Sequence, residues 1–445
     1  MSSGLAIKLA TLFGLWAAFT FAPSAAQATA KVICYYDSKS FVREGLGKTI
    51  LTDIEPALPF CTHLIYGYAG VNGATNKLQS VNSNVDLDQG KGHFRAITAL
   101  KRKYPGLKIL LGVGGGGDAE SEQYLTLLES SMGRISFINS AYELVKSYDF
   151  DGLDLSWQFP TVKPKKIRGT VSSFFHKLKK PFTSDTVIDE KWEEHREEFT
   201  ALVRELKNSF RHDNYQLSVT VMPNVNSSVY FDIPAIINNL DFVVLGAYDF
   251  QTPDRNPKEA DFTAPLYELP ERNPESNVNY QVQWWLSQRA PATKVIVGIP
   301  TYGRCWKLGE DSGITGVPPL RTPKEGHPEG LQIKVPGLVS YPEACAKLPN
   351  PSNAHLKDDQ APLRKVLDPT KRFGTYAFRL GNPDKDYEFG QWCSFEDPDT
   401  AGNKAAYVRA KGLGGIGLFD ITLDDFRGSC SGDKFPILRA AKYRL

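Results

Sequence analysis

Eight short apolar runs rich in β-branched residues recur along the chain, mostly separated by segments with helical periodicity. They are Val32–Tyr36, Leu64–Ala69, Lys108–Val113, Gly152–Trp157, Leu217–Met222, Phe242–Ala247, Val295–Ile299 and Gly415–Phe419. Strands that alternate with helices form parallel sheets through right-handed crossovers, and eight of them close a (β/α)8 barrel. The sequence therefore predicts an α/β TIM barrel. An open doubly wound sheet is the alternative, although no Gly-x-Gly-x-x-Gly turn follows the first run.

Two segments are too long for a minimal barrel repeat. Residues 302–380 carry their own apolar and Pro/Gly-rich pattern. We expect them to form a small α+β subdomain inserted between the seventh strand and its following barrel helix. Residues 31–301 and 381–445 then form the barrel, with outer helices over Thr400–Lys411 and Phe435–Tyr443.

The second segment, residues 161–185, directly follows the fourth run. From Lys163 to Lys180 it holds seven Lys or Arg residues and no acid, and its apolar residues fall at helical spacing. Such a basic amphipathic segment suits an anionic membrane, a polyanionic glycan or a partner groove. In the alternative interpretation, the apolar stripe packs against the barrel mouth and the lysines are solvated. A helix should follow from Asp189 to Phe210, with Asp189 as its N-cap.

The N-terminus and the cysteines indicate a secreted protein. Residues 1–30 contain an apolar run followed by small residues, as in a cleaved signal peptide, whereas a membrane anchor would need a longer run. Six cysteines then favour disulfides, whose pairing the sequence leaves open. Asn226 begins a glycosylation sequon, which is either occupied or unused. A formal net charge of +2 gives no indication of a nucleic-acid partner.

Polar side chains alternate at the end of the fourth run. Successive residues of a strand face opposite sides, so Asp154, Ser156 and Gln158 point one way. A row of carboxylates would suggest acid/base chemistry on a sugar. Here the last position is an amide, which releases no proton near neutral pH.

Chemistry in such barrels sits at the carboxyl ends of the strands. This rule places Gln158, Tyr248, Asp249 and Phe419 around one mouth. The neighbouring pair Asp424 and Asp425 has no His or third carboxylate close in sequence, so we expect it to be solvated or to cap a helix. We predict no metal and no cofactor.

The stretch Asp151–Pro160 resembles the signature of glycoside hydrolase family 18, the chitinases. Runs beginning at Lys31, Leu111, Ala247, Gly298 and Gly414 are similar to five further strands of that family, in order. In the family, a glutamic acid protonates the leaving oxygen and an aspartate two residues earlier orients the substrate's acetamide. The resemblance matches Asp151 and Asp154 to the first two aspartates, and Tyr248 with Asp249 to an acetamide-binding pair.

The departures from the family pattern fall at the reacting groups. Gln158 stands at the acid, Ser156 at the orienting aspartate and Phe159 at the adjacent tyrosine. The resemblance therefore implies a barrel without chitin hydrolysis. We expect Asp151 and Asp154 to remain as hydrogen-bonded core residues, with Ser156, Tyr248 or the backbone as partners.

Sugar binding is a separate question. Lys39, Gly116 and Phe419 occupy positions where the family often has Trp, and neither Lys nor Gly offers a ring on which a sugar can stack. Weak or absent chitin binding is expected, with Asp154, Tyr248, Asp249 and Phe419 as a vestigial glycan site.

One branch of the family, the insect imaginal disc growth factors, is the most similar. This likeness implies a secreted factor that promotes cell proliferation, polarisation and motility through a cell-surface receptor or another extracellular partner. A chitin- or glycan-binding lectin with a cuticle or immune role is the alternative, and an unusual hydrolase is a third. The likeness also implies the disulfides Cys34–Cys61 and Cys345–Cys430. Cys305 and Cys393 either pair or, as we expect, stay as buried thiols.

Overall fold

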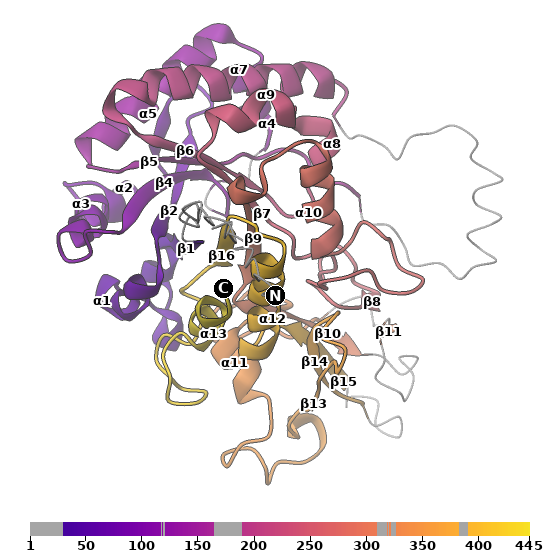
Figure 1. Ribbon diagram of the computed structural model, residues 1–445. Helices are drawn as coiled ribbons and strands as arrows, with labels where there is room; N and C mark the ends of the chain where they lie inside the picture. The colour runs from indigo at the N-terminus through magenta and orange to yellow at the C-terminus, as the bar shows by residue number, and fades with distance from the viewer. Residues whose placement is uncertain are drawn as a thin grey trace, which may run out of the picture.

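Eight parallel strands form a closed barrel in the computed structural model, which describes residues 30–116, 118, 121–163, 189–308, 318, 320–321, 326–381 and 390–445 (Figure 1). The strands are β1 (Lys31–Asp37), β2 (His63–Val71), β4 (Lys108–Gly114), β5 (Gly152–Ser156), β6 (Gln216–Val221), β7 (Phe242–Leu245), β9 (Val295–Pro300) and β16 (Gly415–Phe419). The barrel closes because β1 pairs with both β2 and β16. Each of the eight predicted runs overlaps one of these strands, so the predicted TIM barrel is confirmed.

Side chains fill the barrel interior and leave no pore in its centre. An inner cluster contains Ile33, Tyr35, Ile65, Leu110, Phe242, Val244 and Ile296. Alternate residues of the same strands, such as Leu153 and Leu155 of β5, belong to the larger core between the sheet and the helices. This alternation follows from the two-residue period of a strand.

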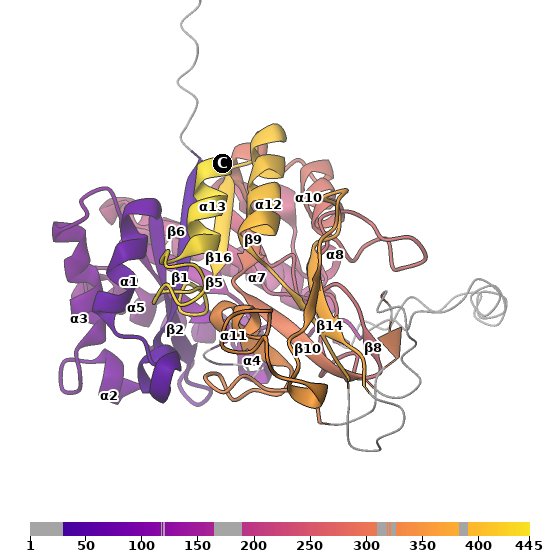
Figure 2. The same ribbon diagram turned by 90° about the horizontal axis from the view of Figure 1, so that it is seen from below.

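Helices surround the barrel on its outer side (Figures 1 and 2). They are α1 (Leu51–Ile54), α2 (Ser83–Asp86), α3 (His93–Thr98), α4 (Ser121–Leu128), α5 (Ser131–Ser147), α7 (Trp192–Phe210), α8 (Ser227–Tyr230), α9 (Ile233–Ile236), α10 (Val278–Ser287), α12 (Pro398–Ala410) and α13 (Pro436–Arg444). The last two cover the ranges predicted for the final outer helices and lie side by side in both views.

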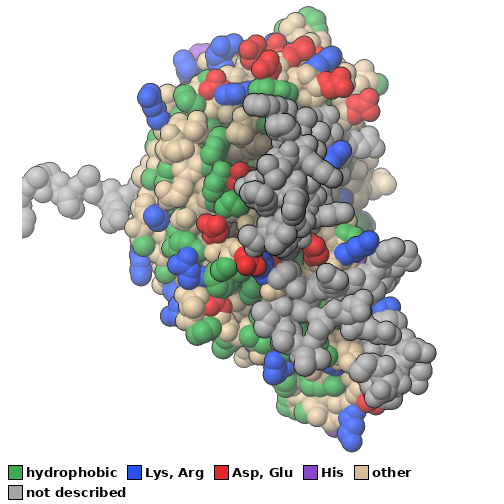
Figure 3. Space-filling view, turned by 90° about the vertical axis from the view of Figure 1, so that its right-hand side faces the viewer, with side chains coloured by type: hydrophobic (Ala, Val, Ile, Leu, Met, Phe, Trp, Pro, Cys, Tyr) green, Lys and Arg blue, Asp and Glu red, His purple; other side chains and the backbone are tan. Residues whose placement is uncertain are grey.

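The long helix α7 starts later than the sequence predicts. Its N-cap is Lys191, so the prediction that Asp189 caps it is wrong. The Asp189 carboxylate instead accepts bonds from the Lys191 backbone N–H, at 3.0 Å, and from His195 Nδ1, at 2.7 Å. Glu193 and Glu194 lie in the first turn, where carboxylates suit the helix dipole. In Figure 3, acidic side chains gather at the upper edge of the face, where Figure 1 places this helix.

A second, antiparallel sheet lies to one side of the barrel (Figure 2). Its five strands, in spatial order, are β12 (Leu338–Ser340), β10 (Tyr302–Leu308), β15 (Gly390–Phe395), β14 (Thr375–Arg379) and β13 (Arg364–Val366). The short helix α11 (Tyr341–Ala346) follows β12. The sheet includes β15 and so extends past residue 380, where the sequence analysis ended the insertion. Shorter strands are β3 (Leu78–Ser80), which pairs with β2, and β8 (Glu259–Ala260), which pairs with β11 (Leu320–Arg321).

All six cysteines form disulfides. Cys34–Cys61 and Cys345–Cys430 are the pairs that the resemblance implied. The expectation that Cys305 and Cys393 stay as thiols is wrong, because these residues lie directly opposite each other in β10 and β15 and are bonded.

Several predicted features lie outside the described residues. They include almost all of the predicted signal peptide, residues 1–30, and most of the basic segment 163–180. Within the described part of the chain, no helix combines the length and apolar character needed to cross a bilayer.

Candidate functional site

Asp154 lies at the floor of the barrel mouth and is fully buried on β5. Its carboxylate accepts hydrogen bonds from the hydroxyls of Ser156, at 2.9 Å, Ser218, at 2.6 Å, and Thr220, at 2.9 and 3.1 Å. Burial raises the pKa of Asp154, and the three hydroxyl donors oppose that rise. The predicted partner Ser156 is correct, and β6 supplies the other two donors.

Ser156 cannot replace the aspartate expected at its position. It is fully buried, and it donates its hydroxyl proton to Asp154. A hydroxyl in this role carries no charge with which to orient an acetamide group.

Gln158 follows β5 at the mouth and is partly buried. Its Nε2 donates to the carbonyl oxygen of Gly115 at 2.6 Å, which directs the amide toward the loop after β4. This loop approaches Tyr68 so closely that a Cβ at Gly115 would lie 2.3 Å from the Tyr68 ring, and the positive φ of Gly115 (+52°) also favours glycine. The side chain that the family resemblance matched to the acid therefore donates a hydrogen bond, and its amide has no acidic proton to release.

Tyr248 and Phe419 meet at the mouth, as the strand assignment predicts. Their rings stack with centroids 5.7 Å apart, and Phe419 also lies 5.2 Å from the ring of Tyr35. Burial raises the pKa of the Tyr248 hydroxyl well above its ordinary value, and the nearby Asp249 carboxylate raises it further. This tyrosine therefore stays protonated at neutral pH.

The Asp249 carboxylate is hydrogen-bonded by two residues that the sequence analysis did not single out. Tyr302 donates its hydroxyl to Asp249 at 2.7 Å, and Arg304 binds both carboxylate oxygens, at 2.9 and 2.6 Å. Burial alone would lower the pKa of Arg304, but the Asp249 carboxylate raises it above its ordinary value. Both partners lie in the run Gly298–Arg304 that carried part of the family resemblance, which is the signal that could have identified them.

Two of the positions without an expected aromatic ring lie in contact at the rim. The exposed Lys39 reaches across from the segment after β1, and its Nζ donates to the carbonyl oxygen of Gly116 at 2.6 Å. A charged amine and a glycine backbone therefore meet at this part of the rim. Neither offers an aromatic ring on which a sugar can stack, as the sequence analysis expected.

Asp420 is a third carboxyl group at the mouth, after Asp154 and Asp249, and the sequence analysis did not single it out. Burial raises its pKa to about 6, although the charge of Arg43 acts in the opposite direction. The side chain is only 4% exposed and accepts a hydrogen bond from the Thr422 N–H at 2.7 Å. Arg43 links this region to β1, through Thr422 Oγ1 at 3.0 Å and Asp37 at 3.4 Å.

Asp151 lies at the opposite end of β5, away from the mouth. Its carboxylate accepts from the Ile109 N–H at 2.8 Å and pairs with Lys108 at 3.2 Å and Lys101 at 3.5 Å. The expectation of a core position is wrong for Asp151, since the residue is only partly buried. It ties β5 to β4 at the closed end of the barrel.

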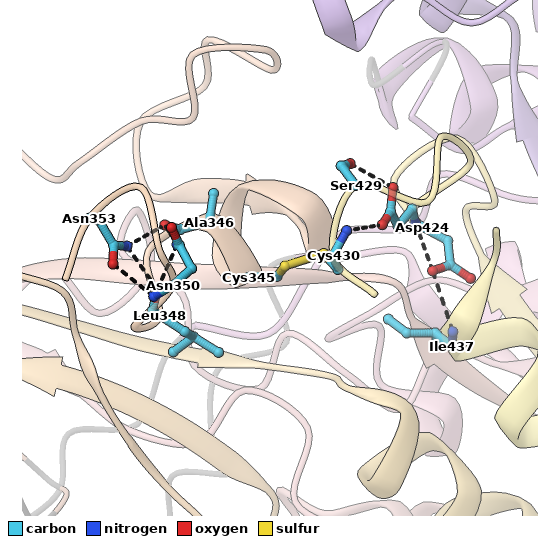
Figure 4. Close-up of a disulfide and its surroundings, with 10 residues drawn as sticks. Cys345, Ala346, Leu348, Asn350, Asn353, Asp424, Ser429, Cys430 and Ile437 are labelled. Carbon is cyan, nitrogen blue, oxygen red and sulfur yellow. Dashed lines mark hydrogen bonds between the residues drawn. A yellow bond between two sulfur atoms is a disulfide. The ribbon is translucent and has the colours of Figure 1, made fainter. Parts of the chain in front are cut away.

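Asp424 and Asp425 are both buried, so the predicted solvated position is wrong. Asp424 caps a helix, as the alternative prediction stated, whereas Asp425 binds the turn that carries Cys430 of the Cys345–Cys430 disulfide (Figure 4). Asp424 accepts from the Leu438 N–H at 3.0 Å at the start of α13, and Asp425 accepts from the Cys430 N–H at 2.7 Å beside the disulfide. Burial raises the pKa of Asp424 to about 7. In the described part of the chain, no group of three His, Cys, Asp or Glu side chains is arranged to hold a metal ion.

The barrel and the mouth residues define a glycoside-hydrolase-like protein, and the comparison with family models agrees. Residues 31–424 match the model described as glycosyl hydrolases family 18. The chain belongs to this family and, within it, to the chitinase-like imaginal disc growth factors of insects.

Two relatives illustrate that membership. Chitinase-like protein Idgf4 of Drosophila melanogaster is 60% identical over 444 residues, covering 99% of this chain and 100% of the relative. Imaginal disk growth factor 6 of the same species is 57% identical over 422 residues, covering 93% of each chain.

Solved structures include a chitinase and a protein described as a pseudo-chitinase. Catalytic domain 2 of the Ostrinia furnacalis Group II chitinase has a TM-score of 0.76 and 29% identity, covering 94% of this chain and 96% of that one. Human YKL-39, described as a pseudo-chitinase with retained chitooligosaccharide binding properties, has a TM-score of 0.72 and 26% identity, covering 94% and 99%.

Proposed function

We propose that this chain is a secreted chitinase-like growth factor that promotes cell proliferation, polarisation and motility without hydrolysing chitin. The observation that carries the proposal is the bond from the Gln158 amide to the Gly115 carbonyl, since an amide occupies the place of the acid. The names of the relatives support the growth-factor part.

Two losses together argue against hydrolysis. A general acid typically contributes about 10²–10⁴-fold in rate, and Gln158 cannot supply it. Ser156 is engaged with Asp154 and cannot orient a reacting acetamide. Asp420 does not replace the acid, because it is buried and bonded to Thr422.

Three features support secretion. Residues 1–30 read as a signal peptide, and three disulfides are typical of an oxidising compartment. The sequon residue Asn226 is the N-cap of α8, and its Oδ1 accepts from the Ser228 N–H at 3.0 Å and hydroxyl at 2.7 Å. We propose that Asn226 is glycosylated. Mass spectrometry before and after glycosidase treatment of the secreted protein would reveal a loss of mass at this peptide.

Growth stimulation can be tested on insect cells in serum-free medium. Purified protein should increase cell number and motility in a dose-dependent way. Gln158→Leu serves as the matched variant, because it removes the amide without restoring an acid and should keep the activity. Cells that respond to neither protein would contradict the proposed function.

Glycan binding is a second candidate function. The partly exposed ring of Phe419 at the mouth favours it, as does the likeness to YKL-39. The contact between Lys39 and Gly116 opposes it, since neither side chain offers a stacking surface. Calorimetric titration with N-acetylglucosamine oligomers decides between a lectin and a growth factor. Micromolar affinity favours the lectin, and heats equal to those of buffer favour the growth factor.

The basic segment remains a proposed partner surface. Its seven cations and lack of acids suit a polyanionic glycan or an anionic membrane. Deleting residues 163–180 should then abolish cell stimulation while leaving the circular dichroism spectrum unchanged. A folded deletion variant with full activity would show that this segment is not the partner surface.

A further inference from the structure

Exposed apolar side chains concentrate on two loops. Among the described residues, five of the twelve exposed large hydrophobic side chains belong to residues 42–50, after β1, and residues 331–335, before β12. We call these five the rim patch: Val42, Leu46, Ile50, Leu331 and Val335. Leu331 is 90% exposed and Leu46 is 63% exposed. Contiguous exposed apolar groups commonly mark an interaction site.

The two loops touch each other although they are far apart in the sequence. Gly47 packs so tightly on the second loop that an added Cβ would lie 2.8 Å from the carbonyl oxygen of Gln332. Lys334 Nζ also forms an ion pair with Glu44 at 2.8 Å. The rim patch is therefore one surface, built jointly by the barrel and by the inserted segment.

The first loop is held in place by backbone hydrogen bonds. The Thr49 N–H donates to the carbonyl of Ser40 at 3.0 Å. Arg427 reaches from the C-terminal segment and donates to the carbonyls of Leu46 and Lys48, at 3.3 and 3.2 Å.

The turn that presents Leu331 is held as firmly. The Gln332 N–H donates to the buried Glu343 carboxylate at 2.6 Å, and the Gly330 N–H donates to the Leu338 carbonyl at 3.2 Å. The backbone that carries Leu331 is thus held in place, which lowers the entropy cost of binding.

Cations border the rim patch. Lys48 lies over the ring of Phe41 at 5.2 Å, and Arg427 lies over the ring of Phe426 at 4.8 Å. Glu44 is paired with Lys334. The complementary surface is an apolar pocket with acidic groups at its edge.

We propose that the rim patch binds an extracellular protein partner whose apolar pocket has an acidic border. This inference rests on the proposed function and supplies the partner surface for it. A protein pocket suits the patch because the backbones of both loops are held by the hydrogen bonds above, so the patch offers a fixed outline that a pocket of complementary shape and charge can recognise.

The test measures binding of fluorescently labelled full-length protein to responsive insect cells. Leu46→Ser with Leu331→Ser should weaken binding at least tenfold, and Lys48→Glu should weaken it severalfold. Met132→Ser with Ile135→Ser is the matched control on α5, where both side chains are also exposed, and should bind like the wild type. Treating the cells with protease should remove the binding.

Other results would overturn the proposal. Equal affinity of the Leu46/Leu331 variant and the wild type for the cells would exclude the rim patch as the binding surface. Light scattering that shows a wild-type dimer and a monomeric variant would make a second copy the occupant. Binding that survives protease and is reproduced on phosphatidylserine vesicles would identify lipid, and not a protein, as the ligand of the rim patch. If the wild type binds through the patch but stimulates no growth, the proposed function fails while the patch stands.

Discussion

The floor and the rim of the barrel mouth differ in what their polar groups do. On the floor, Asp154 is fully buried and accepts bonds from three hydroxyls on β5 and β6. At the rim, Gln158 and Lys39 donate to single backbone carbonyls of the loop after β4. The floor is thus built into the packing of the barrel, whereas each of these rim side chains makes a single hydrogen bond to a loop. The proposed loss of the acid at Gln158 is therefore compatible with an intact floor.

The largest expected effect is at Asp154. Asp154→Ala leaves the hydroxyls of Ser156 and Ser218 buried without their acceptor, while Thr220 keeps the Tyr35 hydroxyl at 2.6 Å. Each hydroxyl left without a partner costs about 1–3 kcal/mol. We expect a loss of about 3 kcal/mol or more in the free energy of unfolding, measured by urea denaturation. Asp151→Ala at the other end of β5 is the control and should cost about 1 kcal/mol, since its ion pairs are partly exposed. Equal losses would show that the floor is not special.

The disulfide between the inserted segment and the C-terminal segment comes next. Cys345 and Cys430 are separated by 85 residues, so their bond restricts a long loop of the unfolded chain. Cys345→Ser with Cys430→Ser should lower stability by about 2–4 kcal/mol. Thermal unfolding without reductant measures the change, and an unaltered midpoint would contradict the expectation.

A pH effect is expected at Asp424. Because its folded-state pKa, about 7, lies above the ordinary carboxyl value, the folded chain binds this proton more tightly than the unfolded chain does. The resulting stability is complete below about pH 4 and is lost as the pH rises toward 7. Asp424→Asn keeps an acceptor for the Leu438 N–H but does not titrate, so its stability should decline less over this range. Identical slopes in urea unfolding would contradict the assignment.

The smallest effect is expected at the rim. Lys39→Ala removes one hydrogen bond of an exposed side chain, and stability should change by less than about 0.5 kcal/mol. Affinity for N-acetylglucosamine oligomers should stay undetectable, because the change adds no stacking surface. A stability loss comparable to that of Asp154→Ala would erase the distinction between floor and rim.

The sequence predicts the parts of this protein that depend on local pattern. The period-two alternation predicted the common face of Asp154 and Ser156, and the spacing of apolar runs predicted the barrel strands. Partners brought together by the fold were less accessible: Arg304 on Asp249 and Lys39 on Gly116 join segments that no local pattern relates. The Cys305–Cys393 bond was missed for the same reason, because it depends on the register of two strands separated by 88 residues.

The central proposal is that this barrel of family 18 does not cleave chitin because Gln158, whose amide releases no proton, takes the place of the family's general acid. Its most direct test incubates the full-length secreted protein with N-acetylglucosamine pentamers at pH 4–8 and follows the products by mass spectrometry, beside an active chitinase. The account predicts that the pentamer stays intact at every pH while the enzyme degrades it. Shorter oligomers that accumulate with turnover would contradict it.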